Sequence, residues 1–75
     1  MINPFGRTMA VHRLKGSYMI AEDHHIEMAD LFKRCMDDWK DDPIIHAQLE
    51  AQYEKELAAA KAYAGLIFNI TKNMV

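Results

Sequence analysis

The sequence predicts an all-α protein: an antiparallel hairpin of two helices, at about residues 17–41 and 43–73, preceded by a short basic arm at residues 1–16. Apolar residues recur every three or four positions in both helical segments, as on one face of an amphipathic helix. The dipeptide Asp42-Pro43 leaves only a very short connection between them, which is typical of antiparallel neighbours. A chain of 75 residues holds at most one domain, so residues 17–75 form a single helical hairpin domain.

The arm is basic, whereas the segment after it is acidic. Arg7, His12, Arg13 and Lys15 occur in a stretch without an acidic residue, and eleven acidic residues outweigh four basic ones in residues 17–56. Because opposite charges attract, three arrangements fit: the arm is solvated or lies on its own body, lies on a neighbouring subunit, or binds an anionic partner. The run RTMAVHRL within it fits a short strand, an extra helical turn or an extended arm.

The first helix is expected to begin after Ser17, a suitable N-cap, and to end near Lys40. On its apolar stripe His24 is expected to be partly buried, with His25 toward solvent. Cys35, on the same stripe, is expected to be buried and unreactive. The predicted stripe consists of Ile20, His24, Met28, Leu31, Phe32, Cys35, Met36 and Trp39.

The second helix is expected to begin at Pro43, with Asp42 as its N-cap, because proline suits the first turn of a helix. Gly65 is either its end or an interior residue. The interior position is favoured, since the stripe continues past Gly65 and a glycine inside a helix costs only about 1 kcal/mol. The predicted stripe consists of Ile45, Leu49, Tyr53, Leu57, Ala60, Ala64, Ile67, Thr71 and Met74.

The C-terminal part of the second helix carries more apolar surface than one hairpin covers. Its apolar residues point in several directions around the helix, and a two-helix hairpin has only one inner side. A second chain is therefore expected to pack there, most simply as a homodimeric four-helix bundle, although a higher oligomer also fits. The predicted oligomer interface consists of Leu66, Ile67, Phe68, Ile70 and Met74.

One residue pair has the spacing of a metal site. Glu22 and His25 form the Glu-x-x-His pattern of di-iron bundles, so a metal-binding helical bundle, with ligands shared across subunits, is the alternative function. His46 and Glu50 also share a helical face, but an antiparallel hairpin places them far from His25. Residues 57–75 contain no carboxylate. Neither a phosphate-binding glycine loop nor a reachable Cys–His pair is present, so the chain is expected to be no enzyme and to need no cofactor.

The predicted function is that of a small non-enzymatic oligomeric binding or regulatory protein, of the inhibitor or adaptor type. It engages a protein partner or a small anionic ligand through its helical surface and the arm residues Arg7, His12, Arg13 and Lys15. Nucleic acid is disfavoured because three cations on an acidic protein make a poor phosphate track. The single cysteine, the lack of a signal sequence and the lack of a membrane-spanning run predict a cytoplasmic protein.

Overall fold

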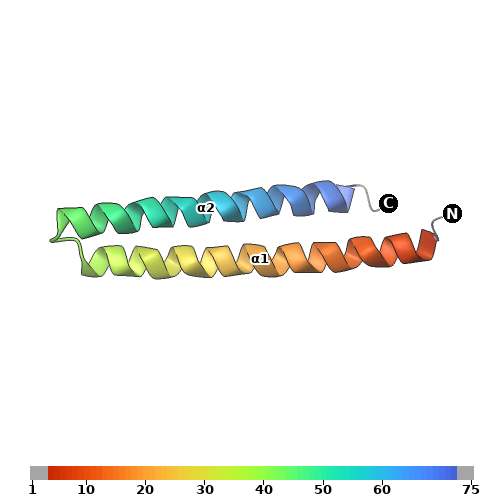
Figure 1. Ribbon diagram of the computed structural model, residues 1–75, viewed down its shortest axis with the longest axis horizontal. Helices are drawn as coiled ribbons and strands as arrows, with labels where there is room; N and C mark the ends of the chain where they lie inside the picture. The colour runs from red at the N-terminus through yellow and green to blue at the C-terminus, as the bar shows by residue number, and fades with distance from the viewer. Residues whose placement is uncertain (1–3, 73–75) are drawn as a thin grey trace.

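The computed structural model describes residues 4–72 of the chain, with side chains from Met9 onward. Two helices, α1 (Pro4–Asp38) and α2 (Pro43–Lys72), pack side by side in opposite directions. They form a rod of 61 × 17 × 14 Å (Figure 1). No strand occurs in this part of the chain. The prediction of an all-α antiparallel hairpin is confirmed.

The first helix begins earlier than the sequence analysis predicts. It starts at Pro4 and continues through Ser17 without interruption, so Ser17 is not an N-cap and the predicted arm is helical wherever it is described. Proline favours the first helical position, and Gly16 keeps a helical backbone, since no described glycine has a positive φ. The run RTMAVHRL is therefore part of α1. The described part of the predicted arm lies beside α2 of its own hairpin, because Val11 and Lys15 are half-buried there.

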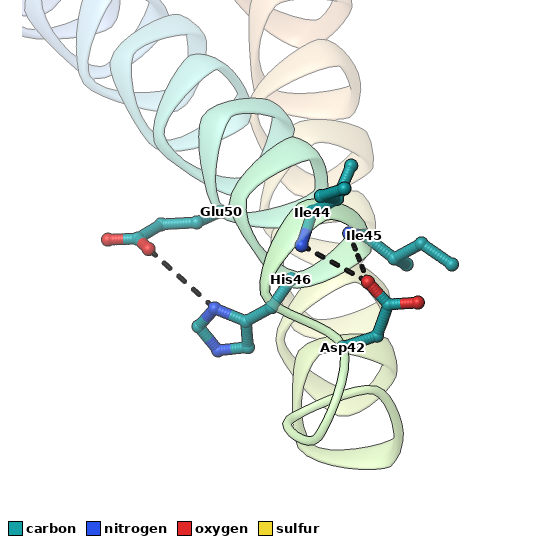
Figure 2. A network of polar contacts seen from close by, with 5 residues as sticks. All are labelled: Asp42, Ile44, Ile45, His46 and Glu50. Atoms are coloured by element: carbon teal, nitrogen blue, oxygen red, sulfur yellow. Dashed lines mark hydrogen bonds and ion pairs between the residues drawn. The ribbon is translucent and has the colours of Figure 1, made fainter.

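The corner of the hairpin forms as predicted. The backbone N–H groups of Ile44 and Ile45 donate to Oδ1 of Asp42, each at 3.1 Å (Figure 2). The N–H of His46 donates to the carbonyl oxygen of Asp42 at 2.9 Å, and the N–H of Asp42 donates to the carbonyl oxygen of Trp39 at 3.1 Å. Asp42 thus caps α2 and closes the turn, because it satisfies N–H groups that have no partner inside the helix.

The two helices meet along a line of residues that we call the seam. Seam residues recur at alternating steps of four and three, the repeat of paired helices that twist around each other. At its centre the seam contains Ala29 and Ala60, the buried apolar residues of the described chain, whose small side chains let the helices approach closely. In α1 the seam consists of Val11, Lys15, Tyr18, Glu22, His25, Ala29, Phe32 and Met36. In α2 it consists of His46, Leu49, Tyr53, Glu56, Ala60, Tyr63, Ile67 and Ile70.

This seam differs from the predicted stripe of the first helix. Met28, Phe32 and Met36 are half-buried as expected. His24 is exposed and His25 is half-buried, the reverse of the prediction. The remaining members of the predicted stripe are also exposed, namely Ile20, Leu31, Cys35 and Trp39. Apolar residues lie on all sides of α1, so their spacing alone does not identify the side that faces α2.

The second helix follows its predicted stripe more closely. Gly65 lies inside α2, which continues to Lys72. Ala64 and Thr71 are exposed, contrary to the prediction, and Met74 lies outside the described residues. The other predicted members are half-buried or buried: Ile45, Leu49, Tyr53, Leu57, Ala60 and Ile67.

Candidate functional site

Polar and aromatic side chains meet in the middle of the seam. Nδ1 of His25 on α1 contacts Oε2 of Glu56 on α2, and both side chains are only partly exposed, at 26% and 20%. The imidazole of His25 stacks on Tyr63, with ring centroids 5.6 Å apart and an interplanar angle of 15°. Tyr63 in turn packs against Tyr18 at 5.8 Å. This cluster links the helices by an ion pair, when His25 is protonated, and by two ring contacts.

The cluster does not have the composition of a metal centre. Glu22 and His25 both lie on the seam, as their spacing predicts, but His25 is paired with Glu56. Among the described residues no group of three His, Cys, Asp or Glu side chains is placed to hold a metal ion. His46 and Glu50, 3.9 Å apart, pair within the first turns of α2, near the corner of the hairpin (Figure 2).

Three members of the cluster were not predicted from the apolar pattern of the sequence. Tyr18, Glu56 and Tyr63 were not identified because the analysis followed apolar residues, and a glutamate on a helix usually faces solvent. A signal for them exists in the sequence. Steps of four and three connect Tyr18 to Glu22 and His25, and likewise Glu56 to Ala60 and Tyr63, so a repeat that admits polar residues includes them.

The four predicted ligand-binding residues do not converge on one point. His12 and Arg13 are exposed, whereas Lys15 is half-buried in the seam. Arg7 lies in the first turns of α1, where the structure describes only the backbone. Since each residue turns a helix by about 100°, Arg13 and Lys15 point in nearly opposite directions. They are spread along the helix rather than gathered around a small ion.

The predicted interface residues also divide into two groups. Ile67 and Ile70 are seam residues that face α1, so the hairpin itself uses them. Leu66 and Phe68 are largely exposed, and Met74 lies outside the described residues.

A longer apolar surface runs along one side of the rod. Each seam position that is reached by a step of four is preceded by a residue at the edge of the seam. In an antiparallel pair of helices, these edge residues of both helices lie on the same side of the rod. Leu31, one turn from Met28, extends this surface. We name it the apolar flank. Its apolar members are Leu14, Ala21, Met28, Leu31, Cys35, Ile45, Ala59 and Leu66, and the polar residue Gln52 lies between Ile45 and Ala59 on α2.

The apolar flank carries few charges compared with the opposite side of the seam. Asp38 and Lys55 lie on this side of the rod, and the outer edge of the flank at Leu31 borders Glu27, Asp30 and Arg34. The opposite side carries Asp23, Asp30, Lys33, Asp37, Glu50, Glu54 and Lys61. The flank is therefore the side of the hairpin that is easiest to remove from water.

The chain matches no protein-family model, no curated protein and no solved structure. Neither helix, over its described length, is long and apolar enough to cross a membrane. The surfaces of the hairpin itself are thus the basis for proposing a function.

Proposed function

We propose that this protein is a small non-enzymatic binding module, of the inhibitor or adaptor type, that works by associating with other protein chains. Its first partner is a second copy of itself, which packs on the apolar flank to form a four-helix bundle. The supporting observation is the poor burial within one hairpin. Half of the residues are hydrophobic by composition, yet the buried apolar residues of the described chain are two alanines.

The surface area supports association. The hairpin exposes 6118 Å², whereas a compact protein of 8.7 kDa exposes about 4,700 Å². Its radius of gyration is 17.4 Å, against about 11 Å for a compact chain of this length. If each copy buries its excess of roughly 1,400 Å², a dimer hides about 2,800 Å² in total, within the range of stable homodimers.

Sedimentation velocity tests this assembly. We expect a dimer for the natural chain and a monomer for the triple variant Leu14→Gln/Leu31→Gln/Leu66→Gln. Glutamine is similar to leucine in size and is also uncharged, but its burial is unfavourable. The dissociation constant of the dimer should therefore increase by more than about 100-fold. The matched control is Ile20→Gln/Ile44→Gln, because these isoleucines are 73% and 72% exposed on the outer sides of the two helices. The control should remain dimeric. A monomeric natural chain, or equal dissociation of both variants, would contradict the assembly.

The basic residues near the start of α1 supply a second binding surface in this proposal. Their spread along the helix suits an extended acidic segment of a protein better than a small anion, which requires converging groups. Arg13 is exposed, and its own helix turn carries no acidic residue, since residues 1–21 contain no Asp or Glu. Arg13 would attract an acidic segment of a partner, and no nearby carboxylate of the same turn would compete for it.

Fluorescence anisotropy with a labelled oligoglutamate peptide tests this second surface. The variant Arg7→Gln/Arg13→Gln should bind the peptide about tenfold more weakly, since two positive charges are lost. The control Lys33→Gln/Arg34→Gln removes the same charge from the acidic part of α1 and should change the affinity little. Equal losses in the two variants would show that only net charge matters and would reject this surface.

We further propose that the protein works in the reducing cytoplasm. Its single cysteine, Cys35, is exposed, contrary to the buried position expected from the sequence. In an oxidising compartment an exposed lone thiol tends to form disulfides between copies. Recovery of the protein from its own cells with Cys35 as a free thiol, measured by alkylation and mass spectrometry, is the expected result.

A further inference from the structure

The charges of the chain divide the rod into two halves. All eleven acidic residues lie in residues 22–56, together with four of the nine basic ones. The remaining five basic residues lie in residues 1–21 and 57–75, where no acidic residue occurs. In the first region the side chains carry a net charge of −7, and in the other two together a net charge of +5, with histidine neutral.

The hairpin brings the two basic regions together. The contact between His25 and Glu56 places the charge boundary of α1 at the same level of the rod as that of α2. The half that contains the corner is therefore acidic on both helices, and the half that contains Pro4 and Lys72 is basic on both (Figure 1). We call these the acidic half and the basic half. The basic half includes Arg13 and Lys15 on α1, and Lys61 and Lys72 on α2.

Within a single hairpin, the acidic and basic side chains of the two halves are mostly too far apart to attract each other. Because α1 is one continuous helix of 35 residues, its basic segment stays at one end of the rod and the acidic corner at the other. At physiological ionic strength charges interact over about 8 Å, much less than the 61 Å length of the rod. The attraction between the halves can only act between molecules.

We propose that the second copy lies antiparallel to the first, so that the basic half of each hairpin lies beside the acidic half of the other. This inference rests on the proposed dimer and adds its orientation. The two copies are related by a two-fold axis perpendicular to the rods, near the level of the His25–Glu56 contact. The apolar flank of each copy covers that of the other, as a symmetric interface requires. The pairing of a basic half with an acidic half therefore occurs twice in the dimer.

The parallel arrangement buries a similar apolar area but opposes like charges. It places +5 beside +5 and −7 beside −7, and juxtaposed like charges disfavour an interface. The apolar flank has too few charges of its own to select an orientation. The net charges of the two halves, −7 and +5, make that selection from a distance, most strongly at low salt, where screening is weak.

Electron paramagnetic resonance on spin-labelled dimers tests the orientation. The label is attached at Lys40→Cys, in the exposed turn, in a Cys35→Ser background so that one thiol remains. With the two-fold axis near the level of His25, each label lies 15 residues from the axis, or about 22 Å along the rod, so we expect a distance of about 45–50 Å in the antiparallel dimer. In a parallel dimer they lie at one end, within roughly 25 Å, since packed helices are about 10 Å apart. Sedimentation of the labelled protein checks that it is still a dimer.

Salt dependence supplies a second measurement. Raising the salt concentration from about 20 mM to about 500 mM weakens an antiparallel dimer, because screening reduces the attraction between its halves. It strengthens a parallel dimer, in which screening relieves repulsion. A dimer with a short label distance, or one that salt stabilises, overturns the orientation and leaves the proposed dimer intact. A chain that sediments as a monomer overturns the dimer itself.

Discussion

The Asp42 side chain is the most completely explained residue of the hairpin. One carboxylate oxygen accepts from both Ile44 and Ile45, and Pro43 follows directly, where a helix needs no N–H donor. These are local interactions within four residues. For that reason the corner was predictable from the sequence: the residues that determine it are neighbours in the chain.

Replacing Asp42 by alanine should lower the free energy of unfolding by about 1 kcal/mol, since the N–H groups of Ile44 and Ile45 lose their acceptor. Asp42→Asn is the matched control and should cost much less, because asparagine caps helices nearly as well as aspartate. Urea unfolding followed by circular dichroism at one fixed protein concentration measures both. If the two variants are equally destabilised, the carboxylate acts through its charge rather than as a cap.

Gly65 allows a prediction of the opposite sign. It has a helical backbone inside α2, and a Cβ atom added there meets no atom within 4 Å. Gly65→Ala should therefore raise the free energy of unfolding by roughly 0.5–1 kcal/mol, since alanine loses less conformational entropy in a helix. Thermal unfolding checks this, and sedimentation shows whether the dimer persists. Since Gly65 lies outside the apolar flank, loss of the dimer would contradict the proposed interface.

At the scale of the helices, the choice of the inner side depends on long-range information. The stripe of α1 that looked most apolar is largely exposed, and the seam carries Lys15, Glu22 and His25 instead. The partners of these residues lie on the other helix: Glu56 is 31 positions from His25 in the chain. A rule that considers the spacing of residues within one helix cannot predict a contact between two helices. The existence of the helices was thus predictable, and a four-three repeat that admits polar residues includes the cluster members, whereas the contact of His25 with Glu56 across the seam was not predictable.

The contact between His25 and Glu56 should show energetic coupling across the seam. In a double-mutant cycle of His25→Ala and Glu56→Ala, we expect a coupling of about 0.5–1 kcal/mol, at the upper end for partly exposed pairs. His46 and Glu50, which are 3.9 Å apart in one helix and more exposed, form the control pair, with an expected coupling of about 0.3 kcal/mol. Urea unfolding of each set of four proteins measures both. A smaller coupling for His25 and Glu56 than for the control would argue against a stabilising contact.

At the scale of the whole molecule, the hairpin leaves large apolar side chains exposed along its length. Its exposed large apolar residues include Leu14, Leu31 and Leu66 on the flank, at 45%, 51% and 42% exposure. Composition alone indicated a surplus of apolar surface, but the sequence analysis placed it at the C-terminal end. Ile67 and Ile70 instead pack in the seam, and the remaining exposed apolar surface extends along the rod.

The stability of such a protein should depend on its concentration. If folding and association are linked, the unfolding temperature rises as the protein is concentrated, because the dimer is favoured by mass action. We expect this rise for the natural chain and its absence for Leu14→Gln/Leu31→Gln/Leu66→Gln. Differential scanning calorimetry over a hundredfold range of concentration provides the comparison. An unfolding temperature of the natural chain that does not change with concentration contradicts a linked dimer.

The antiparallel arrangement also makes the basic half a shared surface. In the proposed antiparallel dimer, the acidic half of the second copy and an acidic segment of another protein are attracted by the same net positive charge of the basic half. Adding oligoglutamate should therefore shift the natural chain from dimer toward monomer in sedimentation, whereas oligolysine of equal length should compete for the acidic half and act likewise. A neutral peptide is the control. If the charged peptides leave the dimer unchanged, the halves do not hold it together.

Both helical ends that lie away from the corner, Pro4 and Lys72, occur at the same end of the rod (Figure 1). A protein domain fused to either end of the chain would leave the hairpin in the same region of space. An antiparallel pair of hairpins would then carry fused domains at its two opposite tips, separated by about the length of the 61 Å rod. In the proposed dimer, the direction of pairing would thus decide whether two attached domains meet or are held apart.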